Sequence, residues 1–417
     1  MKIQSVSARI LSFIDECRLQ PDVWRYSPWP GGPETLYASC FACMLYHYLG
    51  RLETFTSKQK QEWANYLNSW QDPQTGLFIG PEIVPEELMS PKHDLEHVTM
   101  HLTAHVLPTL DLLKSKPPHS LSFAHRFLDP KYLQHWLKRR DWQNAWLEGN
   151  NLLFIGQFLI HLRDVENSSS AQAALDLYFE WLDQTQDPHT GLWGTNGFCS
   201  NCEALYGGYH QLLVYYFEDR PVKYPKRLID IALSLQHTDG GFNPAGGGGA
   251  CQNVDAIDIL LNMYKRTDYK RASIRSALRK SSRHILKMQM SDGGFVYRLN
   301  ESFMHMGIQK TASGRNQANL FPTWFCVHTL ALISEILTDG DFADVAWQFN
   351  NSCSMGWHRE WDKNKNQLTY FNKAQEVAFM LKDIFLRIEG IFPIIRRILP
   401  KQMKDIAKRL MRHKFKY

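Results

Sequence analysis

The chain has 417 residues, of which 44% are apolar, 21% are charged and 13% are aromatic. This composition excludes an intrinsically disordered protein, and the length is sufficient to bury a substantial hydrophobic core. The net charge of +5 gives no argument for nucleic acid, so we expect no nucleic-acid partner. No run of eighteen apolar residues and no signal-peptide core occur, which predicts a cytoplasmic protein.

The first predicted elements are two helices at 5–18 and 35–50. The next segment, 66–78, has a helix end, a glutamine, a turn with Asp and Gly, and an aromatic residue, and an apolar helix follows it at 93–114. The Gly of such a turn permits a positive φ. The Gln amide is able to bond backbone groups that the helix end leaves open.

The same turn pattern recurs further along the chain, at 181–193, 232–242 and 285–295. Self-similarity of this kind predicts a repeat architecture. The remaining predicted helices lie at 127–140, 142–164, 202–217, 251–266 and 319–337. Because a helix that is apolar nearly all round is buried on both sides, the second helix of each pair belongs inside. The sequence therefore predicts an all-α fold, a closed (α/α)6 toroid of six helical hairpins over residues 1–338.

Residues 339–417 differ in character and are predicted to form a C-terminal helical extension. Its last part, 391–417, is rich in Lys and Arg interleaved with apolar residues. One interpretation is a basic amphipathic helix that makes a peripheral membrane contact. The other is an ordinary helix that packs on the toroid with a solvated basic face, since Pro393 and Pro400 interrupt any long regular helix.

The glutamine-turn-aromatic repeats resemble those of squalene–hopene cyclases and of the β subunits of protein prenyltransferases, over roughly residues 55–337. The resemblance implies an α/α toroid with its active site in the central cavity. Prenyltransferases of this kind hold zinc through an Asp and a Cys on one inner helix and a His on the last. Cys251 stands at the matching place, but Gly249 and Pro322 replace the other two ligands. We therefore predict no metal and no cofactor.

Class II terpene cyclases, which the repeats also resemble, protonate an alkene or epoxide with the middle Asp of an Asp-x-Asp-Asp motif. The nearest match here retains Asp255, with Asn253 and Ala256 in place of the flanking acids and Asp258 further along. An acid for this step needs neighbours that set its protonation state. The resemblance thus implies a divergent cyclase-like enzyme with Asp255 as the proton donor.

Four histidines, His93, His97, His101 and His105, recur every four residues and therefore share one face of a helix. Three interpretations remain open for this ladder. It binds zinc with a third ligand from elsewhere, it serves as an acid or base, or it packs against the neighbouring helices.

The starts of the inner helices carry acids, amides and aromatic residues that converge at one mouth if the hairpins close into a ring. Such a mixture is typical of a binding site, because unpaired buried charge is costly. The predicted catalytic residues are Asp255, Asp258, His97 and Glu203. The predicted substrate-binding residues are His93, His101, Trp146, Glu148, Asn150, Tyr206, His210, Asn253 and Trp324.

Three functions follow from these patterns. The first is an isomerase or lyase of the terpene-cyclase type that acts on a small or lipid-like isoprenoid, with aromatic faces stabilising a cation. The second is a carbohydrate-active toroid enzyme (a glycan hydrolase, lyase or epimerase) that uses paired acids. The third is a non-catalytic binding scaffold. A deep aromatic cavity favours the first, and an open polar groove favours the second.

Overall fold

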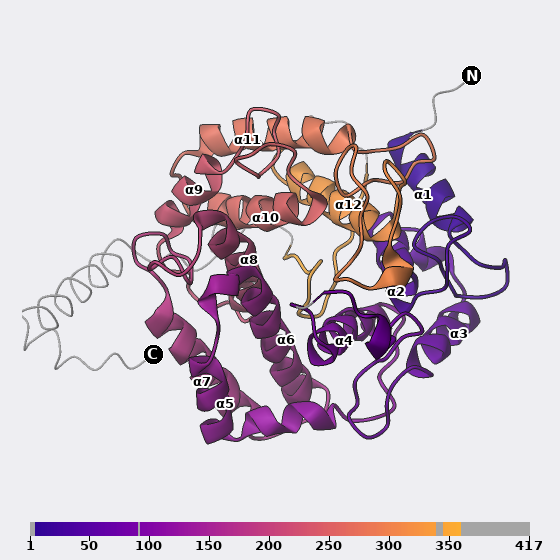
Figure 1. The fold of residues 1–417 in the computed structure, drawn as a ribbon, viewed down its shortest axis with the longest axis horizontal. Helices are drawn as coiled ribbons and strands as arrows, with labels where there is room; N and C mark the ends of the chain where they lie inside the picture. The colour runs from indigo at the N-terminus through magenta and orange to yellow at the C-terminus, as the bar shows by residue number, and fades with distance from the viewer. Residues whose placement is uncertain (1–4, 91, 339–344, 360–417) are drawn as a thin grey trace, which may run out of the picture. The chain divides into compact units, whose positions relative to one another are not determined.

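The computed structural model describes residues 5–90, 92–338 and 345–359. These residues form six helical hairpins, each with an outer helix followed by an inner one (Figure 1). The outer helices are α1 (Val6–Glu16), α3 (Ser57–Asn68), α5 (Pro130–Lys138), α7 (Ala171–Thr185), α9 (Pro225–Ser234) and α11 (Arg271–Leu286). The inner helices are α2 (Leu36–Tyr48), α4 (Leu95–Leu112), α6 (Ala145–Asp164), α8 (Asn201–Phe217), α10 (Ala250–Arg266) and α12 (Leu320–Ser334).

The inner helices contact one another in chain order, and α12 returns to contact α2, which closes the ring. The predicted all-α toroid of six hairpins is thereby confirmed. The connections hold five short 3-10 helices, at Leu52–Thr54, Pro85–Glu87, Ser122–Leu128, Trp142–Asn144 and Gln309–Thr311.

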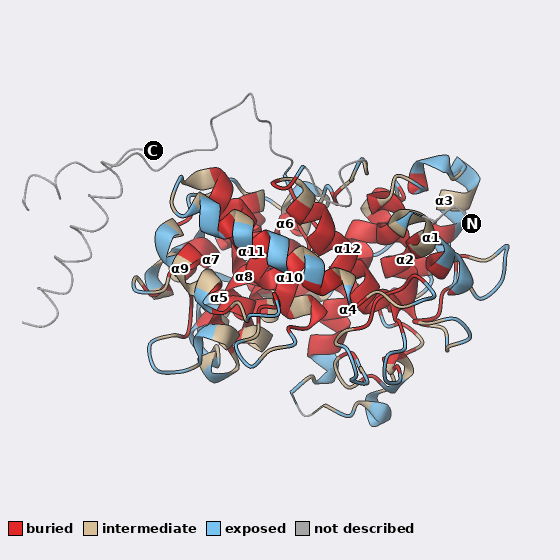
Figure 2. Cartoon of the chain, turned by 90° about the horizontal axis from the view of Figure 1, so that it is seen from above, coloured by how far each residue is buried: buried red, intermediate tan, exposed pale blue. Residues whose placement is uncertain are grey.

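Burial follows the hydrophobic pattern of the sequence. Every residue of α2 is buried, whereas α11 buries a stripe that includes Ile274, Leu278 and Ile285, at helical spacing. Figure 2 shows the same contrast, with α10 and α12 buried along nearly their whole length and exposed turns along α11. The inner helices therefore pack on both sides, and the outer helices cover them.

The same type of hydrogen bond occurs in each of the four predicted turns. The side chains of Gln71, Gln186, Gln236 and Gln289 each donate to the carbonyl of a turn glycine, over 2.8–3.1 Å. All four glycines have positive φ, and a side chain there would be strained. The Gln amide thus closes its own turn rather than the preceding helix end. Gln71 also donates to His119 O over 2.8 Å, which ties the turn to the segment after α4.

Residues 345–359 pack at the end of the ring where the inner helices finish. His47 and Tyr48 bond the carbonyls of Phe349 and Gly356, over 3.0 and 2.8 Å. Lys265, near the end of α10, is 2.8 Å from His358. The predicted boundary at residue 338 remains a prediction, and the predicted basic helix at 391–417 lies outside the described residues. None of the helices in the described ranges is long and apolar enough to cross a membrane.

Candidate functional site

A cavity of about 450 Å³ opens where the inner helices begin. That volume lies within the range of small-molecule sites. Its polar lining comprises Lys92, His93, His97, His101, Asn144, Asn150, Glu203, His210, Asp255, Glu301, Ser302 and His305. Its apolar and aromatic lining comprises Trp146, Leu147, Cys251, Tyr297, Phe303, Met304, Met306, Phe321, Phe325 and Met355. Inner helices therefore supply half of the lining residues, and the loop 297–306 supplies most of the others.

One wall of the cavity is part of the loop between α11 and α12. Within it, Phe303 stacks on Tyr297 and on Phe321, with ring centroids 4.8 and 5.3 Å apart. Met89 N donates to Gly307 O over 3.0 Å, which joins this loop to the segment before α4. His305 is buried in the same loop, with its ring centroid 5.0 Å from that of His101.

Asp255 lies on α10 and lines the cavity, with only 1% of its surface exposed. No hydrogen-bond partner reaches its Oδ2 among the described residues. Burial and the charge of Asp258 raise its pKa well above the ordinary value. A raised pKa favours the protonated form of the carboxyl, which is the form that donates a proton.

Asp258 lies one turn deeper on α10, outside the cavity lining, and is fully buried. Asn262 donates to its Oδ1 over 3.1 Å. Burial raises the pKa of Asp258 to about 7, against the opposing effects of Asn262 and of two basic residues nearby. The two predicted acids are therefore neighbours, but only Asp255 faces the cavity.

The histidine ladder begins at His93, which precedes α4 rather than lying on it, and continues down α4 from the cavity into the core. His93, His97 and His101 line the cavity, and His105 is buried one turn further on. Burial lowers the pKa of all four, to about 4 for His93 and His105. These imidazoles are therefore neutral at pH 7 and present lone pairs rather than positive charges. His93, His97 and Asp255 line the same cavity.

Four further predicted residues also line the cavity: Trp146, Asn150, Glu203 and His210. The His210 ring lies with Nδ1 2.7 Å from Tyr206 O, and burial lowers its pKa to about 4. Glu203 is half-buried in the first turn of α8. Of the thirteen predicted site residues, eight therefore meet around one cavity, and their chemical roles remain predictions.

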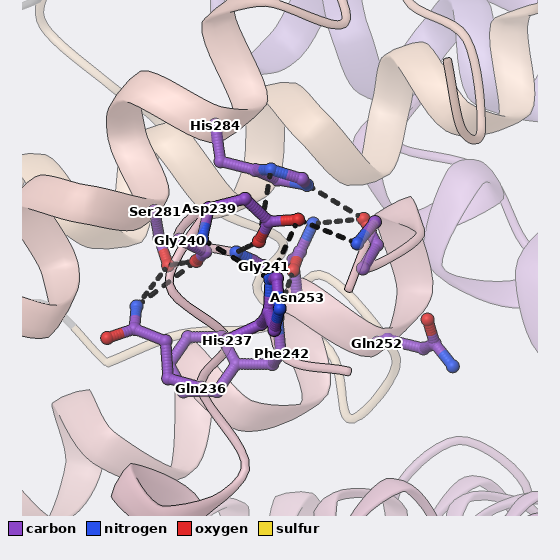
Figure 3. A network of polar contacts seen from close by, with 12 residues as sticks. Gln236, His237, Asp239, Gly240, Gly241, Phe242, Gln252, Asn253, Ser281 and His284 are labelled. Atoms are coloured by element: carbon purple, nitrogen blue, oxygen red, sulfur yellow. Dashed lines mark hydrogen bonds and ion pairs between the residues drawn. The ribbon is translucent and has the colours of Figure 1, made fainter. Parts of the chain in front are cut away.

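The other predicted residues lie beside the cavity rather than in its lining. Tyr206 donates to Phe242 O over 2.7 Å, and its ring contacts Trp146. Asn253 accepts from Phe242 N over 3.0 Å and donates to Gly248 O, which fastens a repeat turn to α10 (Figure 3). Trp324 is fully buried, and its ring stacks on Phe41 at 5.2 Å.

Glu148 is the remaining predicted residue, and it forms a buried ion pair. Its Oε2 accepts from Arg140 Nη1 over 2.7 Å and from Asn151 Nδ2 over 3.1 Å. Asn151 in turn lies 2.8 Å from His97. Glu148 thus contacts the histidine ladder through one intervening amide. Across the described ranges, no three His, Cys, Asp or Glu side chains are grouped to hold a metal ion.

Sequence reasoning missed the loop residues His305, Tyr297 and Phe303. The loop has no helical periodicity to place it near the cavity. The only signal was the run of aromatic and sulfur-containing side chains at 295–306.

The sequence profile of the prenyltransferase alpha-alpha toroid domain matches residues 33–122 and 125–312, about two thirds of the chain. Among solved structures, a polysaccharide lyase is similar with a TM-score of 0.45 and 13% identity. That match covers 79% of this chain and 97% of the lyase chain. No curated protein matches the sequence.

Proposed function

This chain belongs to the prenyltransferase alpha-alpha toroid domain family, and from that premise we propose an enzyme that rearranges an isoprenoid. The reaction is a cyclisation or isomerisation, and a proton from Asp255 starts it in the central cavity. The observation that carries the proposal is the position of this acid. Its carboxyl is buried, has a raised pKa and has no hydrogen-bond partner at Oδ2 among the described residues, in a cavity that aromatic and methionine side chains also line.

The cavity lining supports an apolar substrate. Trp146, Phe321 and Phe325 present aromatic surface, and Met304, Met306 and Met355 adapt to irregular shapes. Aromatic faces also stabilise positive charge that develops on carbon. Lys92 is the single Lys or Arg in the described lining. This charge balance favours a neutral isoprenoid, such as an alcohol or hydrocarbon, over a diphosphate ester.

The test is turnover of farnesol, geranylgeraniol and squalene in D₂O, with products identified by mass spectrometry. We expect an isomer or cyclised product that carries one deuterium. Asp255→Asn should lower the rate at least ~100-fold, since general acids contribute 10²–10⁴-fold. Asp268→Asn, a substitution at an exposed residue, is the control. Full activity of Asp255→Asn would exclude Asp255 as the donor.

One observation favours a second candidate, a carbohydrate-active enzyme. Glu203 and Asp255 both line the cavity, and Asn144 and Asn150 line it too. A pair of carboxyl groups with amides around them suits cleavage of a glycosidic bond. Release of new reducing ends from an oligosaccharide panel, lost in Glu203→Gln, would establish this candidate in place of the first. Binding of an isoprenoid without turnover would instead identify a scaffold.

We also propose that the basic segment 391–417 makes a peripheral membrane contact, which suits a substrate dissolved in lipid. Cosedimentation of the full chain with vesicles of anionic lipid tests this. Binding should weaken when Arg396, Arg397, Lys404 and Lys408 are replaced by Gln. Equal binding of the two proteins would refute the contact.

A further inference from the structure

We propose that His97 Nε2 is the base that takes the proton from the substrate, and that Asn151 is the residue that positions it. The inference rests on the proposed function and narrows it to a double-bond migration, in which one proton is added and another removed. It comes from a hydrogen-bond chain that runs from Arg140 through Glu148 and Asn151 to His97. No step depends on the substrate's identity beyond a carbon–carbon double bond.

The chain begins at the buried ion pair. Glu148 Oε1 accepts from Asp141 N over 2.9 Å, and its Oε2 accepts from Arg140 and from Asn151 Nδ2. An ionised carboxylate only accepts hydrogen bonds, so the group of Asn151 that faces Glu148 must be its NH₂. The amide of Asn151 therefore has one orientation, with its carbonyl Oδ1 turned away from Glu148.

That orientation decides the protonation of His97. Asn151 Oδ1 lies 2.8 Å from His97 Nδ1. A carbonyl oxygen has no proton to donate, so His97 Nδ1 must carry the proton in this bond. The neutral ring then holds a lone pair at Nε2, the nitrogen of a general base. The Glu148 carboxylate, the NH₂ of Asn151 and the carbonyl of Asn151 thus select one tautomer of His97.

The lone pair at Nε2 has no hydrogen-bond partner in the part of the chain that the structure describes. His97 lines the cavity, and its Nε2 is buried without a hydrogen bond among the described residues. Burial keeps the ring neutral, because it lowers the pKa of His97. When the ring accepts a proton, Asn151 and the carboxylate of Glu148 behind it stabilise the imidazolium. A base with this environment is ready at neutral pH.

The base and the acid lie on helices at opposite sides of the ring. Helices α4 and α10 are separated by two inner helices in either direction around the toroid, and they lie on opposite sides of it (Figure 1). His97 and Asp255 therefore contact a bound substrate from opposite walls of one cavity. A proton is able to enter on one side while another leaves on the other.

The step balances as follows. The O–H bond of Asp255 breaks, and its proton forms a C–H bond at one carbon of the double bond. A C–H bond next to the other carbon breaks, its electrons form the new double bond, and its proton goes to His97 Nε2. After the product leaves, solvent water returns a proton from His97 to Asp255. Nothing is oxidised or reduced, and the product is an isomer of the substrate.

The acid strength of Asp255 favours the two transfers together. Its raised pKa makes it a weak acid, so a free carbocation with an aspartate anion beside Asp258 would lie high in energy. Removal of a proton by His97 in the same step avoids the free carbocation and leaves the positive charge on an imidazolium that Asn151 and Glu148 stabilise. A base opposite the acid therefore compensates for the missing flanking acids of the cyclase motif.

The first experiment is independent of turnover. Long-range ¹⁵N NMR of the full-length protein, labelled at histidine, reports which ring nitrogen of His97 carries the proton at pH 7. We expect the Nδ1–H tautomer in the wild type and in Asn151→Asp, where an acceptor is kept. We expect a mixture of tautomers in Asn151→Leu. An Nε2–H tautomer in the wild type would overturn the proposal.

The second experiment uses N,N-dimethylfarnesylamine, whose ammonium N–H mimics the proton that the base receives. Calorimetry should show that His97→Gln weakens binding at least tenfold. His161→Gln, on α6 but outside the cavity lining, should bind as the wild type does. Equal affinity of wild type and His97→Gln would overturn the role of His97, whether or not any isoprenoid is turned over.

The third experiment applies once an isoprenoid is turned over. His97→Gln should lower kcat at least 100-fold with little change in KM. Asn151→Asp should move the acidic limb of the kcat profile to higher pH, because a carboxylate stabilises the imidazolium. A purely structural role of Asn151 would lower activity without moving that limb. Absence of turnover with every isoprenoid substrate would refute the proposed function, and the tautomer and amine-binding results would still decide the role of His97.

Discussion

Lys265 Nζ lies 2.8 Å from His358 Nε2, and this contact fastens residues 345–359 to the end of α10. The same ammonium group donates to Glu335 over 3.2 Å and to Arg359 O over 3.3 Å. Its side chain is only 2% exposed, and burial lowers the pKa of Lys265 to about 8. One buried cation therefore holds three partners at the end of the ring away from the mouth.

Lys265→Met should release this segment while leaving the toroid folded. Hydrogen bonds to charged groups contribute about 1.5–3 kcal/mol each, so protection of the amides at 350–357 should fall about 100-fold. Hydrogen exchange measured by mass spectrometry tests this. Lys270→Met, which removes a half-exposed pair with Asp230, is the matched control and should leave these amides unchanged. Unchanged protection in Lys265→Met would contradict the role of this contact.

Asp258 should make stability fall as the pH rises. The unfolded chain titrates an Asp near about 3.9, whereas in the folded protein the pKa of Asp258 is about 7. Between these values the folded state binds more protons, so the free energy of unfolding decreases with pH, by roughly 4 kcal/mol in total. Below the lower value the penalty is absent, and above the higher value it is complete.

The variant Asp258→Asn removes this titration. Relative to the wild type, we expect it to gain roughly 4 kcal/mol of stability between pH 4 and pH 8. Urea unfolding across that range measures the difference. For Asp268→Asn, at an exposed position, the free energy of unfolding should change with pH as it does in the wild type. If the free energy of unfolding of Asp258→Asn also changed with pH as in the wild type, Asp258 would ionise freely in the folded protein.

Gly207 should tolerate no side chain, because α6 and α8 approach each other there at backbone distance. A Cβ at this position would lie 2.2 Å from Ala145 O, which is backbone and cannot move aside. Overpacking of a rigid contact costs about 1–3 kcal/mol or more. We therefore expect Gly207→Ala to lose at least ~3 kcal/mol of stability, despite the higher helix propensity of Ala.

The neighbouring residue gives a matched control. A Cβ at Gly208 would meet a methyl group at the end of the Leu192 side chain, which is free to change rotamer. Gly208→Ala should thus lose much less stability than Gly207→Ala in chemical denaturation. If the two variants were equally stable, the close approach of α6 and α8 would not limit this position.

Breaking the ion pair of Arg140 with Glu148 should be costly. The two side chains are 12% and 8% exposed, so Arg140→Leu leaves a buried carboxylate without its cation. Loss of one partner of such a pair typically costs about 3–5 kcal/mol. Arg139→Leu, at an exposed neighbour, should stay within about 0.5 kcal/mol of the wild type. Thermal or urea unfolding compares them, and a small loss in Arg140→Leu would indicate that water reaches Glu148.

The fold could be predicted because the faces of each helix that are apolar in the sequence are the faces that the packing buries. An inner helix such as α2 is apolar on every face, and a ring is an arrangement that buries all such faces. The glycines of the turns have positive φ, as their repeated position suggested. The six hairpins thus follow from local residue choices.

The site could be predicted only in part, and the reason is helix rotation. A helix that is apolar all round has no preferred face in its sequence, so the direction of Trp324 on α12 was not predictable. Trp324 packs against Phe41 of α2 instead of the cavity. The spacing of four residues did fix a common face of α4 for His97, His101 and His105, although His93 precedes the helix, and three of the four histidines line the cavity. His305 lies in a loop, where no period applies.

Closure of the ring by α12 against α2 has a consequence for synthesis on the ribosome. The two helices end at residues 334 and 48, yet each covers a face of the other. At about 5–20 residues per second, the first hairpin waits roughly 15–60 s for its last neighbour. During that time the apolar flank of α2 faces solvent. We therefore expect a chaperone that shields hydrophobic surface to bind the nascent chain until the ring is complete.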